Sequence, residues 1–125
     1  MATPEKVKIK NSGASEKEDV IGYLPEVYTD FIKRYPNIGK AYDTLADDCH
    51  KAGPLDNKTR RLIKLGIAIG ISSEGSVRSH TRKALDEGIS PEEIRHVVLL
   101  AFTTVGFPAT VAAYKWVEEV LEKPK

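Results

Sequence analysis

Ser73, Ser76 and His80 are the residues of this sequence whose types and spacing best suit chemistry. They follow one another at intervals of three and four positions within the segment ISSEGSVRSHTRKALDEG, residues 71–88. An α-helix has about 3.6 residues per turn, so these intervals place the three side chains on one face. The unperturbed pKa of histidine is about 6.5, which lets His80 exchange protons at neutral pH. The segment predicts a helix that presents an imidazole beside two hydroxyls.

The two serines have a chemical and a structural interpretation. Ser76 with His80 has the spacing of a nucleophile and its base. No aspartate stands at a suitable distance to orient the histidine, and helix capping explains both hydroxyls adequately. A serine hydrolase is therefore the weaker hypothesis.

Charged residues around this segment offer further candidates. Glu74 can orient His80 or act as a general acid, and it is equally typical of an exposed first helical turn stabilised by the helix dipole. Arg78 and Arg82, four positions apart, suit a carboxylate ligand. They lie about 200° around the helix from His80, so we expect them outside its site, as a solvated basic stripe. Arg61 is a separate cation that can receive an anionic substrate or pair with Glu74.

Composition indicates one ordinary globular domain. The chain has 125 residues, of which 41% are hydrophobic and 30% charged, and its formal net charge is +1. This charge gives no reason to expect nucleic acid or a membrane surface as a partner. The single cysteine, Cys49, excludes an intrachain disulfide and fits a reducing, cytoplasmic location. We expect residues 1–18 to be a flexible polar segment without a secretory signal, and residues 19–125 to form the domain.

The pattern after Ile21 is helical almost throughout. Proline, glycine and capping residues predict helix starts near Pro25, at Asn37 and Asp56, and at a capping box formed by Ser90 and Glu93. A last helix is expected to restart at Pro108. With the helix around His80, this gives an all-α protomer of about six helices.

Two segments leave room for another structure. Residues 97–114 carry no charge over 18 positions, yet the sequence Gly106-Phe107-Pro108 interrupts them, which favours two buried helices over a membrane span. The isoleucines and the partial alternation of residues 62–71 could describe a strand. The cap at Asp56 favours a helix that is apolar on nearly all sides and lies in the core. Gly66 and Gly70 would leave a groove along it for another helix.

No metal or phosphate site is predicted. His50 fits the last turn of its helix, and His96 faces either the core or a subunit boundary. Neither lies in a metal-ligand pattern, and there is no glycine-rich phosphate loop. The basic cluster at residues 58–64 lacks aromatic partners, so solvated helix turns explain it better than nucleic acid does.

Three segments together resemble the carboxymuconolactone decarboxylase family of the alkylhydroperoxidase-D-like superfamily. They are LDNKTRRLIKLGIAIG, SSEGSVRSHTRKALDEGISPEEI and VVLLAFTTVGFPATVAAY, which lie within residues 55–117. Residues 19–53 look like a looser extension. The resemblance implies an all-α fold and a homo-oligomer, a trimer or hexamer, with sites near subunit boundaries.

The resemblance also implies where this chain departs from the superfamily's peroxidases. Those proteins have cysteines where this chain has Ser73 and Ser76, and a glutamate where it has Arg61, twelve positions earlier. A hydroxyl cannot cycle through sulfenic acid and disulfide. A peroxidase of the same fold is therefore the disfavoured alternative, and a non-catalytic oligomeric binding protein is another.

The decarboxylases of the family need no cysteine pair, and this chain is more similar to them in that respect. The resemblance then implies a lyase, without a cofactor, that acts on a small carboxylated, lactone-like substrate. We predict His80, Glu74 and Ser76 as catalytic residues, and Arg61 and Ser73 as substrate-binding residues. The substrate carboxylate must be held, the developing negative charge stabilised and the product reprotonated.

Overall fold

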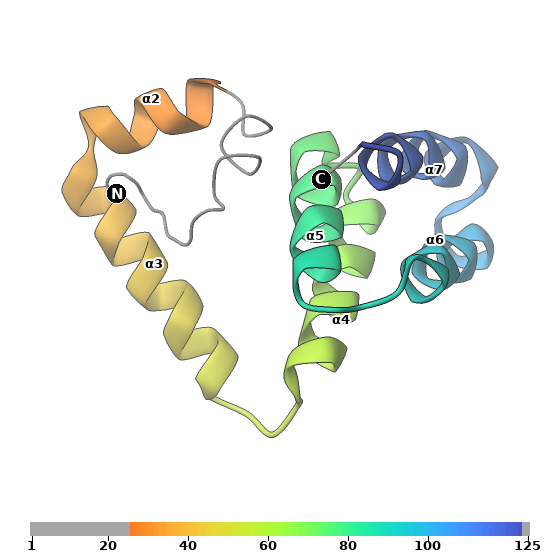
Figure 1. Cartoon of the computed structure of the whole chain (residues 1–125), viewed down its shortest axis with the longest axis horizontal. Helices are drawn as coiled ribbons and strands as arrows, with labels where there is room; N and C mark the ends of the chain where they lie inside the picture. Colours follow the sequence, from red (N-terminus) through yellow and green to blue (C-terminus); the bar gives the residue numbers. More distant parts are fainter. Residues whose placement is uncertain (1–25, 124–125) are drawn as a thin grey trace. The chain divides into compact units, whose positions relative to one another are not determined.

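The computed structural model describes residues 26–123, and every regular element in that range is an α-helix (Figure 1). The all-α prediction is confirmed. The described residues divide after Pro54 into two compact units, which are described separately below. The helices are α2 (Glu26–Arg34), α3 (Pro36–Lys51), α4 (Asn57–Gly70), α5 (Glu74–Asp86), α6 (Pro91–Val105) and α7 (Phe107–Leu121).

The domain boundaries expected from the sequence stay a prediction. Residues 1–18, expected to be flexible, lie outside the described residues, as does Pro25 at the expected entry to the first helix. None of the helices between residues 26 and 123 is long and apolar enough to cross a membrane.

In the first unit, α2 packs against α3 through a short corner. The rings of Phe31 and Tyr35 lie 5.2 Å apart between centroids. Gly39 is buried against Ile32, where an added Cβ would come within 2.9 Å of a side-chain carbon. The expected cap at Asn37 is wrong, because α3 starts one residue earlier at Pro36, a position that needs no backbone N–H donor.

In the second unit, side-chain caps fix two helix starts where the sequence predicts them. The Asp56 carboxylate accepts a hydrogen bond of 2.8 Å from the Thr59 backbone N–H at the start of α4. At the start of α6, the Ser90 hydroxyl accepts from Glu93 N–H, and the Glu93 carboxylate accepts from Ser90 N–H, at 3.1 and 3.0 Å. Each bond satisfies an amide that a helix start leaves without an intrahelical partner.

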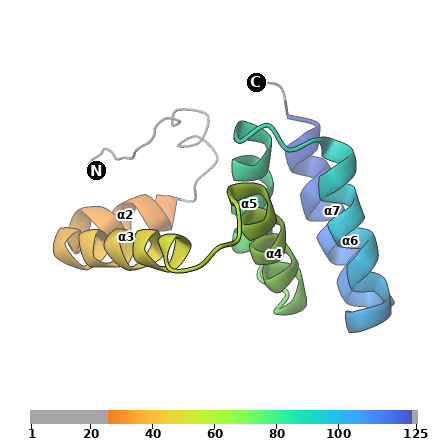
Figure 2. The ribbon, with the colours of Figure 1, turned by 90° about the horizontal axis from the view of Figure 1, so that it is seen from below.

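The second unit is built from two helix pairs, α4 with α5 and α6 with α7 (Figures 1 and 2). Helix α5 also contacts α7, and α4 contacts α6. Charged groups join the helices at the rim: Arg95 binds Glu118 by two hydrogen bonds of 2.7 and 3.0 Å, and Lys58 lies 2.5 Å from Glu93. The core between the helices is apolar and includes Leu65, Ile69, Val77, Ala84, Ile94, Val98, Ala113 and Val117.

Helix α4 differs from the expectation that it would be apolar on nearly all sides within the core. Its Leu65 and Ile69 are buried, whereas Ile63 and Ile67 are exposed. Gly66 does allow a neighbour to approach, since an added Cβ would lie 3.8 Å from Val97 of α6. Gly70 faces open space, so the groove expected from two glycines exists only at the first of them.

The uncharged segment 97–114 forms the expected pair of helices, α6 and α7, around a corner at Gly106. This glycine has a φ of 95°, a backbone conformation that L-residues avoid. Helix α7 begins at Phe107, one residue before the expected restart at Pro108. The pair is not fully buried as expected: several large apolar side chains on it are exposed, namely Leu99, Leu100, Phe102, Phe107, Val111 and Tyr114.

Replacing Ser90 tests the capping box. Ser90→Ala removes one acceptor at the start of α6, and we expect it to lower the free energy of unfolding by about 1 kcal/mol. Chemical denaturation followed by circular dichroism measures this loss. Thr103→Ala, which removes an exposed hydroxyl from the same helix, is the matched control and should change stability by less than about 0.5 kcal/mol. Equal stability of the two variants would contradict the role of the cap.

Candidate functional site

The structure separates Ser73 from the helix that carries Ser76 and His80. Helix α5 begins at Glu74, and Ser73 precedes it in an extended conformation with φ −93° and ψ 98°. Ser72, just before, has a φ of 53°, which ends the regular path of the chain after α4. The Ser73 side chain makes no capping hydrogen bond. The expectation that all three side chains share one helix face is therefore correct for Ser76 and His80 and wrong for Ser73.

Arg61, His80 and Glu87 form a polar cluster between α4 and the C-terminal half of α5. The Arg61 guanidinium donates from Nε to Glu87 Oε1 at 3.0 Å and from Nη2 to Glu87 Oε2 at 2.9 Å. Its third nitrogen, Nη1, lies 2.8 Å from His80 Nδ1. Arg61 is only 7% exposed, and Glu87, the C-cap residue of α5, covers it on one side. We call Arg61, His80 and Glu87 the RHE cluster.

Glu87 is the functional candidate that the sequence interpretation missed. It stands seven positions after His80, two helical turns away on nearly the same face of α5. The spacing of Glu87 from His80 places both residues on one side of α5. It indicates a partner for Arg61 only when α4 is known to present that arginine to the same side. Arg61 was expected to receive a substrate or pair with Glu74, and the structure pairs it with Glu87 instead.

Glu74 and Arg78 belong to a different network at the other end of α5. Arg78 Nε lies 3.1 Å from Glu74 Oε2, and Arg78 also binds Glu119 of α7. The Glu74 side chain is 56% exposed, as expected of a first-turn glutamate near a helix N-terminus. The expected solvated basic stripe is wrong, because Arg82 is buried and the Arg78 side chain is only 18% exposed.

Lys83 lies on α5, one turn after His80. Desolvation, followed by repulsion from Arg61, Arg82 and Lys64, lowers the pKa of Lys83 to about 8. Glu87 acts in the opposite direction. The residue as a whole is exposed, and burial around its amine is the leading cause of the lowered pKa. This region therefore gathers positive charge next to His80.

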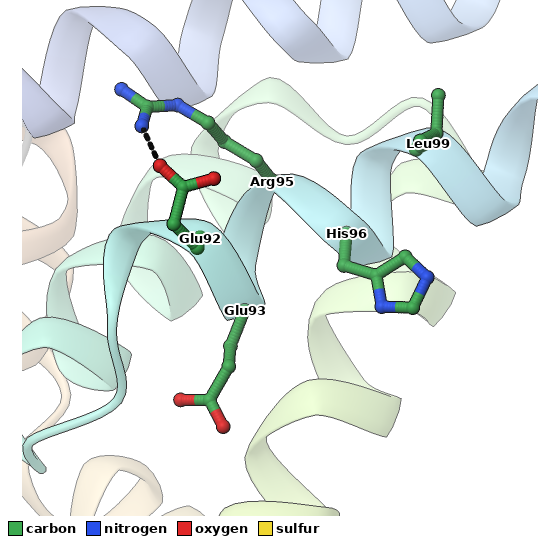
Figure 3. A pocket seen from close by; sticks show the side chains of 5 residues that line it. All are labelled: Glu92, Glu93, Arg95, His96 and Leu99. Carbon is green, nitrogen blue, oxygen red and sulfur yellow. Dashed lines mark hydrogen bonds and ion pairs between the residues drawn. The ribbon is translucent and has the colours of Figure 1, made fainter.

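The remaining histidines lie elsewhere. His96 is exposed and lines a shallow depression of about 380 Å³ along α6, with Leu99 and the charged residues Glu92, Glu93 and Arg95 around it (Figure 3). The side chain points away from Arg95 in that view. His50 is in the last turn of α3, as predicted. Across residues 26–123 no three His, Cys, Asp or Glu side chains are grouped so as to hold a metal ion.

The model of the carboxymuconolactone decarboxylase family matches residues 36–119, two thirds of the chain. This chain belongs to that family. The match extends the resemblance found at residues 55–117 to include α3, and it contains the whole RHE cluster.

Individual relatives agree with this assignment. An uncharacterized protein of Methanocaldococcus jannaschii is 32% identical over 89 residues, which span 70% of this chain and 86% of that protein. The 4-carboxymuconolactone decarboxylase of Acinetobacter baylyi is 28% identical over 54% of this chain and 51% of its own length. The nitrosuccinic acid decarboxylase of Metarhizium robertsii is 39% identical over 47% of this chain and 41% of its own length.

A solved structure supports the fold. The crystal structure of a carboxymuconolactone decarboxylase family protein from Legionella pneumophila superposes with a TM-score of 0.65. The superposition covers 82% of this chain and 98% of that protein, at 24% sequence identity.

The reactivity of Lys83 tests the positive environment beside His80. A lysine whose pKa is about 8 is half unprotonated at pH 8, so Lys83 should react first with a limiting amount of acetic anhydride. Peptide mass spectrometry compares its acetylation with that of the other lysines. Lys64→Met removes one repelling cation and should lower the preference for Lys83. Uniform acetylation of all lysines in the unaltered protein would contradict the lowered pKa.

Proposed function

We propose that this protein is a cofactor-independent lyase that removes carbon dioxide from a small carboxylated, lactone-like substrate. The observation that carries the proposal is the RHE cluster: an imidazole held at 2.8 Å by a buried arginine, on the helix that the family match includes. Two relatives that match parts of the chain are decarboxylases by name. Their matched segments span 51% and 41% of those proteins, so the substrate is proposed by analogy.

The chemistry of the cluster suits such a reaction. Loss of carbon dioxide leaves an electron pair that the conjugated carbonyl of a lactone can accept, and a nearby N–H group stabilises the charge that develops on its oxygen. His80 is the residue we assign to the reacting end of the substrate. No redox step is needed, and the carbon left behind regains a proton at the end of the reaction.

The substrate carboxylate requires a cation, and Arg61 is poorly placed to supply it. Three of its five N–H donors are committed within the RHE cluster, and the side chain is buried. Lys83 is exposed and lies on the same helix as His80, so we propose that it takes the role first assigned to Arg61. Ser76, one turn before His80, remains a candidate contact. Glu74 is the first residue of α5 and Ser73 precedes it, so both are further from His80 along the chain.

A thiol peroxidase is the weaker alternative on the same fold. Ser73 and Ser76 occupy the places of its cysteines, and Cys49 is the one thiol of the chain. Cys49 is exposed on α3, in the other compact unit from His80. It has no second cysteine with which to form a disulfide within the chain.

We further propose that the chain forms a homo-oligomer, a trimer or hexamer. The support is apolar surface on α6 and α7: Leu99, Leu100 and Tyr114 are each more than half exposed. The rings of Phe102 and Phe107 lie 5.4 Å apart across the Gly106 corner and extend this surface. Clustered apolar side chains of this size are typical of an interface between subunits.

Release of carbon dioxide from 4-carboxymuconolactone tests the lyase proposal. We expect turnover by the unaltered protein and a loss of about 100-fold or more in His80→Ala, since the variant lacks the imidazole at the reacting end. His96→Ala, which removes the exposed histidine of α6, is the matched control and should keep full turnover.

Three results would contradict this proposal. Equal turnover by the unaltered protein and His80→Ala would remove His80 from the mechanism. No turnover of either 4-carboxymuconolactone or nitrosuccinate would favour a non-catalytic binding protein. Thiol-dependent consumption of peroxide would favour the peroxidase.

Light scattering coupled to gel filtration tests the oligomer. We expect a mass three or six times that of the 13.8 kDa chain. Leu100→Glu places a charge on the apolar surface of α6 and should shift the protein toward the monomer. Glu122→Lys, an exposed charge reversal at the end of α7, should leave the mass unchanged. A monomeric unaltered protein, or equal masses for both variants and the unaltered protein, would contradict this proposal.

A further inference from the structure

The hydrogen bond between Arg61 and His80 has a defined direction. A guanidinium carries five N–H donors and no acceptor, and it keeps its proton in proteins. In the 2.8 Å contact, Arg61 Nη1 must therefore donate and His80 Nδ1 must accept. A nitrogen that accepts offers a lone pair, so Nδ1 carries no proton. The proton of the neutral ring then resides on Nε2.

A doubly protonated His80 conflicts with the same contact. It would set an N–H on Nδ1 against an N–H of Arg61, and a second positive charge beside a buried one. Neither clash is relieved by rotating the arginine, because Glu87 holds its Nε and Nη2 by two hydrogen bonds of 3.0 and 2.9 Å. A bidentate pair of this kind fixes the plane of the guanidinium as well as its position.

We propose that Glu87, acting through Arg61, holds His80 as the neutral Nε2–H tautomer, so that the imidazole serves its ligand as a hydrogen-bond donor and not as a base. Arg61 and Glu87 are positioning residues in this assignment. The assignment of the tautomer stands without the proposed function. Its catalytic consequence, that the Nε2–H group stabilises negative charge on a substrate oxygen, rests on the lyase proposal.

The order in which Glu87, Arg61 and His80 contact one another determines the tautomer of the imidazole. A carboxylate bound directly to Nδ1 would stabilise a proton there and leave Nε2 free to accept one, as a general base does. Because Arg61 stands between Glu87 and His80, Nδ1 accepts a hydrogen bond and the ring proton is on Nε2 instead. The same reversal argues against a serine hydrolase, because an Nε2 that already carries a proton cannot take one from Ser76.

Nitrogen NMR of the imidazole tests the tautomer without any substrate. In protein labelled with ¹⁵N-histidine at pH 7, long-range proton–nitrogen correlation separates a protonated from an unprotonated ring nitrogen. We expect the His80 signals to show an unprotonated Nδ1 and a protonated Nε2. The signals are assigned by their loss in His80→Gln. An Nδ1–H tautomer or a doubly protonated ring would overturn the proposal.

The role of Glu87 is tested in the same spectra. Glu87→Gln keeps the shape of the side chain but removes the charge that anchors Arg61, and we expect His80 to become a mixture of protonation states. Arg61→Lys, which lacks the planar fork, should have the same effect. Glu92→Gln, at an exposed glutamate of α6, is the control and should leave His80 unchanged. A His80 spectrum unaltered by Glu87→Gln would overturn the role assigned to Glu87.

Activity gives an independent readout of the donor if the lyase proposal holds. The side-chain amide of Gln can supply an N–H near the place of Nε2, so His80→Gln should lose about tenfold less turnover than His80→Ala. Equal loss in both variants would contradict the donor role. A protein without lyase activity would refute the proposed function and leave the NMR result to decide the tautomer.

Discussion

A single buried cation organises the region that we identify as the site. Arg61 of α4 is only 7% exposed, and a buried charge without partners would be costly. The bidentate bond to Glu87 makes its burial tolerable and orients the remaining N–H groups of the guanidinium. One of these groups meets His80, so the ion pair that secures the two helices also defines the chemistry of the imidazole.

Arg61 and the two serines, Ser73 and Ser76, are best considered together. In the peroxidases that the chain resembles, a glutamate at this place helps to activate thiols. In this chain positions 73 and 76 carry hydroxyls, and position 61 carries a cation that pairs with Glu87. These three residue types are chemically consistent with one another, because a site without thiols needs no acid to activate them, and we propose that it holds a neutral ring beside a cation.

The sequence predicted the helices well, because helix caps depend on residues close together in the chain. The features that it did not predict depend on contacts between helices. Asp56 and Ser90 each accept a hydrogen bond from a residue three positions later, so their caps could be recognised from spacing alone. The pair of Arg61 and Glu87 joins residues 26 positions apart, and it depends on how α4 packs against α5. Ser73 lies outside the helix because its own backbone is extended, and no residue type in the segment indicated this. Burial of α4 was overestimated because an apolar side chain such as Ile67 can equally face a surface.

The two partners of Arg61 on α5 lie seven residues apart, almost two full turns, and this spacing limits how the helix can change over evolution. Inserting or deleting one residue between His80 and Glu87 would rotate one of them by about 100° away from the arginine. Length variation among descendants of this chain should therefore collect in loops, while the stretch from 80 to 87 changes by substitution alone.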